Sequence, residues 1–300
     1  MAQAICDADG PAAAPEIPPA IRREAAGGMG RADGALELRF KRRDGVTQLD
    51  HLYQAAPLRA LFPRVSRGEP PQAALTNTSG GLVGGDRLRI RLACGPGAAA
   101  TAVAQAAEKV YRSRGADARI DTVLSLAEGA WLEWLPQETI LFQDARMRRV
   151  TRIELAPDAR LLAGEILVFG RRARGEATHR GLLRDAWEVS RGGRPVWADA
   201  LHLEGDYAAT LRASAGFDGA AATATALYAA PDAGDRLTLA RDLLPADGVT
   251  SGATAFEGLM VVRWLARDPL ALRRAFGAFW SGFRHRAAGL PDALPRLWHV

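Results

Sequence analysis

The 300-residue sequence has almost no lysine and almost no cysteine. Of its 39 basic residues only Lys41 and Lys109 are lysines, and its two cysteines are Cys6 and Cys94. Two cysteines cannot form a disulfide framework, which indicates a reducing compartment. The net charge of +5 invites a nucleic-acid-binding interpretation. However, acidic residues are interspersed with the basic ones, no recognition motif is present, and the arginine and alanine excess indicates a genomic composition bias.

Long hydrophobic runs are also missing. No segment approaches the roughly 18 apolar residues that a membrane-spanning helix needs. Residues 1–30 contain no basic segment followed by an apolar one, so they do not resemble a secretory signal. We therefore expect a soluble cytoplasmic protein that binds neither membrane nor nucleic acid.

Several common catalytic motifs are absent. There is no C-x-x-C, H-x-H or H-E-x-x-H pattern, which argues against a preformed zinc site. There is no G-x-S-x-G, so a serine hydrolase elbow is unsupported. The glycine-rich segment NTSGGLVGGD at 77–86 lacks the Gly-Lys-Ser/Thr of a P-loop and precedes a strand-like run, RLRIRL.

The chain divides into a short tail and one long domain. Residues 1–33 are rich in Ala, Pro and Gly and predict a flexible tail. Strand-like alternation begins at 36–40 (LELRF), and residues 34–300 are expected to form a single domain. At 48% hydrophobic residues, this domain is able to bury a sizeable core.

A repeat of about 30 residues runs through the middle of the sequence. The segments RLRIRLACGPGA (87–98), IDTVLSLAEGA (120–130) and VTRIELAPDA (150–159) each join a β-type run to a turn that ends in alanine. This spacing predicts a mainly β fold with a layered or β-helix-like winding of strands. Evenly spaced turns in an ordinary β-sandwich are the alternative. A looser fourth copy is WEVSRGGRPVWAD at 187–199.

The last third predicts two or so α-helices. One short helix is expected within 231–244, and FEGLMVVRWL at 256–265 indicates a buried strand. Asp268-Pro269 then supplies an N-cap and a proline at the first helical position. The expected apolar face carries aromatic residues at helical spacing, namely Leu272, Phe276, Phe279, Trp280 and Phe283, with Arg274 and His285 opposite and Arg284 and Arg286 near the helix end, where the dipole favours cations.

Carboxylates in apolar or strand-like surroundings are the remaining chemical signal. Glu165, flanked by LLAG and ILVF, is expected to be at least partly buried and paired with Arg171, Arg172 or Arg174. The alternative is a row of carboxylates lining an internal path for a cation. The wider set is Asp86, Glu133, Glu138, Glu165, Glu176 and Asp199. The glycines before Asp86 (Gly80, Gly81, Gly84 and Gly85) also fit a simple turn braced by an aspartate.

Four motifs in order carry a family resemblance. They are NTSGGLVGGD at 77–86, KVYRS at 109–113, EWLPQETILF at 133–142 and GR-x-x-x-GE at 170–176. Together with PRLW at 295–298, they make residues 35–300 similar to the UreD (UreH) family of urease accessory proteins. One departure is Glu108, where the family more often carries a small or hydroxyl residue.

The resemblance implies a non-enzymatic chaperone with a mainly β fold and a few C-terminal helices. Its implied partners are the urease apoenzyme, UreF and the GTPase UreG. Nickel would be in transit through an internal tunnel, with no tightly bound cofactor. By motif match, Asp86, Glu165 and Asp199 would lie along that path, although Asp199 is outside the clearest motifs. The aromatic face of the last helix is expected to pack on the β-core, and its rim or nearby apolar surface to meet the UreF-like partner. Partner binding is assigned to Phe276, Phe279, Trp280 and Phe283.

Two other function classes stay open at this point. A carbohydrate-active enzyme on a β-solenoid would use Asp86 and Glu133 as acid and base in one open groove. A plain interaction module would show no metal dependence. The spatial arrangement of the carboxylates distinguishes the enzyme from the metal path.

Overall fold

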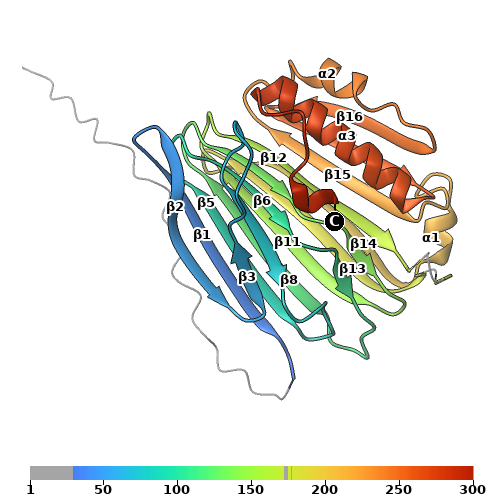
Figure 1. The fold of residues 1–300 in the computed structure, drawn as a ribbon. Coiled ribbons are helices and arrows are strands. Elements are labelled where there is room, and N and C mark those ends of the chain that lie inside the picture. Colours follow the sequence, from blue (N-terminus) through green and yellow to red (C-terminus); the bar gives the residue numbers. More distant parts are fainter. Residues whose placement is uncertain (1–29, 172–174, 177, 300) are drawn as a thin grey trace, which may run out of the picture.

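Two large β-sheets, layered face to face, make up most of the computed structural model (Figure 1), which describes residues 30–171, 175–176 and 178–299. The seven-stranded sheet has the order β14-β13-β11-β8-β5-β1-β2. Its strands are β1 (Asp33–Arg43), β2 (Val46–Ala55), β5 (Arg87–Cys94), β8 (Ala118–Leu126), β11 (Arg146–Leu155), β13 (Arg180–Arg191) and β14 (Arg194–Asp206).

The ten-stranded sheet has the order β16-β17-β15-β12-β9-β6-β4-β3, with β10 pairing both β12 and β7. Its strands are β3 (Leu58–Leu61), β4 (Gln72–Asn77), β6 (Ala99–Ala104), β7 (Glu108–Val110), β9 (Trp131–Leu135), β10 (Thr139–Leu141), β12 (Arg160–Phe169), β15 (Ala222–Ala229), β16 (Val249–Phe256) and β17 (Leu259–Ala266).

The central strands form a solenoid-like stack of coils. Each coil places one strand in each sheet, as β5–β6, β8–β9 and β11–β12 do, and equivalent strands of successive coils pair in parallel. At each corner the backbone N–H of Ala98, Ala130 or Ala159 donates to the carbonyl three residues earlier, and all three alanines are buried. A larger side chain there would collide with the interior, which explains the recurring alanine. The predicted 30-residue winding is confirmed.

The fourth predicted copy is wrong. Residues 187–199 belong to an antiparallel hairpin of β13 and β14 within one sheet, rather than to a coil that crosses between sheets. The reason is the turn: Gly192 and Gly193 both have positive φ, and such a turn reverses the chain within two residues.

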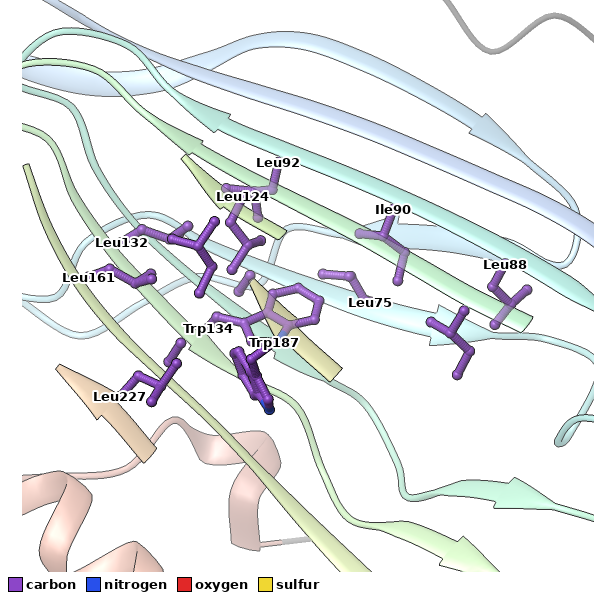
Figure 2. Close-up of a cluster of buried hydrophobic side chains, with 14 of the residues drawn as sticks. Leu75, Leu88, Ile90, Leu92, Leu124, Leu132, Trp134, Leu161, Trp187 and Leu227 are labelled. Carbon is purple, nitrogen blue, oxygen red and sulfur yellow. The ribbon is translucent and has the colours of Figure 1, made fainter. Parts of the chain in front are cut away.

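The space between the sheets is filled mainly by aliphatic side chains. Figure 2 shows leucines from both sheets around Trp134 of β9 and Trp187 of β13. Inward-facing positions alternate with outward ones along β5, β8 and β11, as the sequence pattern predicts.

The C-terminal part adds a second core on the outside of the ten-stranded sheet. Helix α3 (Pro269–Ala288) lies across β12, β15 and β17, and α2 (Leu237–Asp242) packs beside β16 (Figure 1). The side chain of Asp268 accepts a hydrogen bond from the backbone N–H of Leu270, as its N-cap role predicts. Two short elements were not predicted: α1 (Ala208–Arg212) and a 3-10 helix at Arg296–His299. Within the described residues, no helix combines the length and apolar character of a membrane span.

The aromatic face of α3 is turned inward. The side chains of Phe276, Phe279, Trp280 and Phe283 are fully buried and contact Tyr228 and Trp264 of the sheet or one another. They have no exposed surface for a partner, because the sheet already covers them. The prediction of partner binding therefore does not fit these four side chains in the isolated chain.

Gly164 of β12 tests how closely α3 packs on the sheet. A Cβ at this position would lie 2.7 Å from the Phe276 ring and 3.0 Å from the Trp280 ring. We expect Gly164→Ala to lower the free energy of unfolding by about 1–3 kcal/mol, because the helix must shift. Gly252→Ala is the control, since a Cβ there meets no atom within 4 Å. Equal urea midpoints for the two variants would contradict this packing.

Candidate functional site

A cavity of about 180 Å³ lies between the two sheets. Three of the four motifs that carry the resemblance contribute to its wall: Asn77, Gly80 and Gly81 from the first, Lys109 from the second and Thr139 from the third. Residues more than 60 positions apart thus surround one space, which we call the inner cavity.

Backbone pairing brings the first two motifs together. The N–H of Leu82 donates to the carbonyl of Lys109 at 2.7 Å, and the N–H of Tyr111 donates to the carbonyl of Leu82 at 2.8 Å. Gly81 has a φ of +141°, and a Cβ there would lie 2.5 Å from the Tyr111 ring. Only glycine permits this approach. The glycine loop is therefore shaped to close against β7 at the edge of the inner cavity.

Glu108 is a site residue that the sequence interpretation missed. It stands beside the inner cavity, and the amide nitrogen of Asn77 donates to both its carboxylate oxygens, at 3.2 and 3.1 Å. Burial raises the pKa of Glu108 to about 7. The available signal is a lone carboxylate that follows Ala106 and Ala107 and opens β7, but the sequence interpretation uses it only as a departure from the family pattern.

Arg149 of β11 reaches across the interior and joins the sheets. Its Nε donates to Asp185 on β13 at 2.8 Å, and its Nη1 donates to the hydroxyl of Thr139 on β10 at 3.0 Å. Its Nη2 contacts both Asp185 and Glu165 of β12. We call Arg149, Glu165 and Asp185 the central cluster.

The predicted burial of Glu165 is correct, but the predicted pairing with Arg171 is wrong. Arg171 binds Glu176, whereas Arg172 and Arg174 lie outside the described residues. Glu165 instead contacts Arg149 and accepts a 2.7 Å hydrogen bond from the indole N–H of Trp187. Nearby sequence positions are a poor guide here, because each coil folds one strand over the other and brings side chains of the two sheets into contact.

The central cluster has fewer positive than negative groups. Burial raises the pKa of Glu165 to about 8; Arg149 opposes this rise and the charge of Asp185 adds to it. One guanidinium thus serves two buried carboxylates, with Glu108 close enough to influence the pKa of Arg149 as well. Such a centre attracts an additional cation, a proton included.

A second cavity, of about 510 Å³, begins on the other side of the central cluster. Its wall includes Glu165, Asp185 and Asp199, and Glu165 lines both cavities. Asp199 of β14 forms a 2.6 Å ion pair with Arg263 of β17, and about 40% of its side chain is exposed. The structure therefore places two of the three predicted path residues, Glu165 and Asp199, around one cavity, which we call the outer cavity.

Asp86 does not line either cavity. One of its carboxylate oxygens accepts from the N–H of Ala32 at 2.8 Å, and the other accepts from the N–H of Val83 at 2.9 Å. These contacts match the role of a buried aspartate that braces a turn. Gly84 and Gly85 belong to the same turn and pack against Ser113 and Arg31.

Glu133 belongs to a separate buried cluster below α3. It binds Arg284 through both carboxylate oxygens, at 2.7 and 2.8 Å, and Arg284 also binds Glu69. Arg284 lies near the end of α3, as predicted, and it is fully buried. Because Glu133 and Asp86 are each engaged in their own buried contacts, they do not form the open catalytic pair of the enzyme alternative.

The carboxylates are spread along the interior. Within the described ranges, no three His, Cys, Asp or Glu side chains gather closely enough to hold a metal ion. Glu108, Glu165 and Asp199 instead occupy successive cavity walls. Separated oxygen ligands bind a divalent cation weakly, which suits passage rather than storage.

The raised pKa of Glu108 makes folding stability depend on pH. Between its usual value of 4.5 and about 7, the folded chain holds this proton more strongly than the unfolded chain does. Stability should therefore fall by about 1–3 kcal/mol as pH rises through this window. We expect Glu108→Gln to reduce that fall, as measured by urea unfolding from pH 4.5 to 8. The exposed Glu128→Gln is the control, and an unchanged slope in the Glu108 variant would contradict the assignment.

Comparison with known proteins agrees with the geometry. The family model for UreD urease accessory protein matches residues 32–299. The UreD proteins of Magnetococcus marinus and Azorhizobium caulinodans are 46% and 42% identical to the chain, each over 89% of it and over 94% and 96% of their own lengths. The UreD of Methylobacterium sp. strain 4-46 is 47% identical over 85% of the chain and 90% of its own length. The chain belongs to the UreD family of urease accessory proteins.

Proposed function

We propose that this chain is a non-enzymatic scaffold that binds apo-urease together with UreF and UreG and conducts nickel through its interior. A role in urease maturation follows from the family. The observation that supports conduction is the position of Glu165, which lines the inner and the outer cavity at once. A cation that moves between the two spaces meets this carboxylate.

The proposed route uses carboxylates in sequence. Glu108 is beside the inner cavity, Glu165 and Asp185 are at the junction, and Asp199 is in the outer cavity. Each offers oxygen ligands suited to a divalent cation. Asp86 has a different place in this proposal: it holds the glycine loop that shapes the entrance region, because its oxygens already accept backbone hydrogen bonds.

Arg149 has two effects on such a route. Its guanidinium stands at the junction and repels a passing cation, so the junction must not be a deep binding site. The neighbouring carboxyl groups outnumber it, and a metal cation that displaces the proton of Glu165 meets two carboxylates, so the junction is not a barrier to cations either. This near balance favours weak, reversible binding, and weak binding is what transfer to a tighter final site requires.

Replacing the carboxyl groups of Glu165 at the junction and Asp199 in the outer cavity by amides should reduce nickel delivery. We expect urease co-expressed with UreF, UreG and the Glu165→Gln/Asp199→Asn variant to contain less nickel than with the wild type, by about fivefold or more, because a neutral amide attracts a cation far less. Gln at 165 retains an oxygen that accepts from Trp187. The measurement is nickel per urease active site by mass spectrometry.

The matched control is Glu188→Gln, an acid-to-amide change on the outer face of β13 that lines neither cavity. Thermal unfolding and pull-down of UreF and apo-urease check that each variant is folded and assembled. Full nickel loading with a folded, assembled double variant would remove the junction from the route. Loss of partner capture would instead place these residues in assembly.

A further inference from the structure

The outer face of the seven-stranded sheet carries four arginines in one line. Arg87 of β5, Arg119 of β8, Arg148 of β11 and Arg184 of β13 are successive partners in the strand register. We call these four the arginine row. On β14 the row continues with His202, the partner of Arg184.

Most of the row lacks compensating charge. Paired strands are about 4.8 Å apart, and like charges directly opposite one another destabilise a sheet. Arg148 binds Asp117, but the side chains of Arg87, Arg119 and Arg184 make no ion pair or hydrogen bond within the described residues. A general arginine excess explains how common the residue is, but it does not explain three unpaired arginines in one register line.

A positively charged pocket of about 390 Å³ continues the row. Arg146, two residues before Arg148 on β11, lies in its wall together with Arg112, Arg114 and Arg180. Asp144 is the carboxylate among the described lining residues, and it is shared by Arg112 at 3.4 Å and Arg180 at 4.0 Å. Arg146 is itself paired with Asp117 at 2.7 Å and with Glu204 at 3.8 Å. The excess positive charge of the pocket, which we call the arginine pocket, therefore comes from Arg112, Arg114 and Arg180 around Asp144.

The surface beside the row is small and aliphatic on β11, β13 and β14. Two residues further along each strand, the next outward line carries Val150, Ala186 and Ala200 on these strands. On β5 and β8 the same line carries Arg89, which pairs with Asp33, and Asp121, which lies 3.6 Å from Arg152. No aromatic side chain occupies the outward positions of β5, β8 or β11. A partner that covers this face thus meets a line of cations that borders small apolar groups on β11, β13 and β14, without rings on which nucleic-acid bases stack.

We propose that the arginine row and the arginine pocket form the docking surface for an acidic, amphipathic α-helix of a protein partner. A helix rises 5.4 Å per turn, so carboxylates placed once per turn recur at nearly the spacing of the strands. A helix across the strands sets these carboxylates on the arginines and its small apolar residues on Val150, Ala186 and Ala200. The pocket receives a further carboxylate at the end of the row.

A designed peptide tests this surface on the full-length chain. The probe is a fluorescent helical peptide with one glutamate per turn on one face and alanine and leucine beside it, and its binding is followed by anisotropy. A second peptide has the same composition with the glutamates distributed around the helix. A single-stranded DNA of similar charge is the third probe.

The test variant is Arg119→Gln/Arg184→Gln, and Arg274→Gln/Arg286→Gln on α3 is the control. Like the arginines in the test pair, these two make no ion pair in the described part of the chain. We expect the test variant to bind the patterned peptide about tenfold or more weakly, while the control variant matches the wild type. The melting temperature of the test variant should equal or exceed that of the wild type, because the substitutions relieve repulsion between the arginines of the row.

Three results would overturn the proposal. One is no binding of the patterned peptide, or equal binding by wild type and test variant. Another is equally tight binding of the unpatterned peptide, which would reduce the effect to net charge. The third is tighter binding of the DNA than of the patterned peptide, with the same loss in the test variant, which would make the row a nucleic-acid surface.

Discussion

The in-register stacking of parallel coils is the constraint on which the other features of the molecule depend. Because each coil repeats the path of the previous one, residues about 30 positions apart become neighbours across the sheet. Any side-chain type that recurs with this period forms a line. Leucines produce the core in this way, and the buried corner alanines keep the period by fitting the turn. The same rule aligns the arginine row and sets Arg149 beside Asp185.

Two buried arginines, Arg284 and Arg149, are each bound by two carboxylates, but one cluster is structural and the other is part of the candidate site. Arg284 of α3 points into the interior, where Glu133, Glu69 and two backbone carbonyls accept its hydrogen bonds. Removing one partner of such a network leaves a buried charge, so the cluster fixes the helix and the following segment on the sheet. Arg149 is equally well bonded, but cavities border its partners. The charged groups are of the same kind in both clusters. What makes the cluster around Arg149 a candidate site is that its carboxylates line cavities.

Local patterns predicted the parts of the fold that depend on local physics. Alternation along 87–94 and 150–155, the Asp268 cap and the aromatic spacing of α3 all reflect interactions within one element or one turn. The hairpin at 187–199 was mistaken for a coil because both begin with the same type of strand. The Gly192-Gly193 turn distinguishes them. It reverses the chain through the positive φ angles of both glycines, and the hydrophobic pattern of the strands carries no trace of that reversal.

The candidate site was predictable only where burial alone indicated it. Apolar neighbours identify Glu165 as buried, yet its partner Arg149 lies 16 positions earlier, on the other strand of the same coil and in the opposite sheet, so proximity in sequence does not point to it. For a related reason, the sequence places Asp86 on the cation path and gives Glu108 no site role, whereas in the structure Asp86 braces a turn and Glu108 lines the inner cavity. A carboxylate in a glycine loop looks exposed and available, but its oxygens are taken by backbone N–H groups.

Glu108 looked incidental, but it stands at a cavity, partly buried and held by Asn77. Its raised pKa means that it binds a proton readily near neutral pH, and a group that binds one cation readily is suited to exchange it for another. Protons and a divalent metal would therefore compete along the same carboxylates. Burial raises the pKa of these carboxyl groups, so a metal must displace a proton to bind them. Metal binding is weakened accordingly and stays exchangeable, as the proposed route requires.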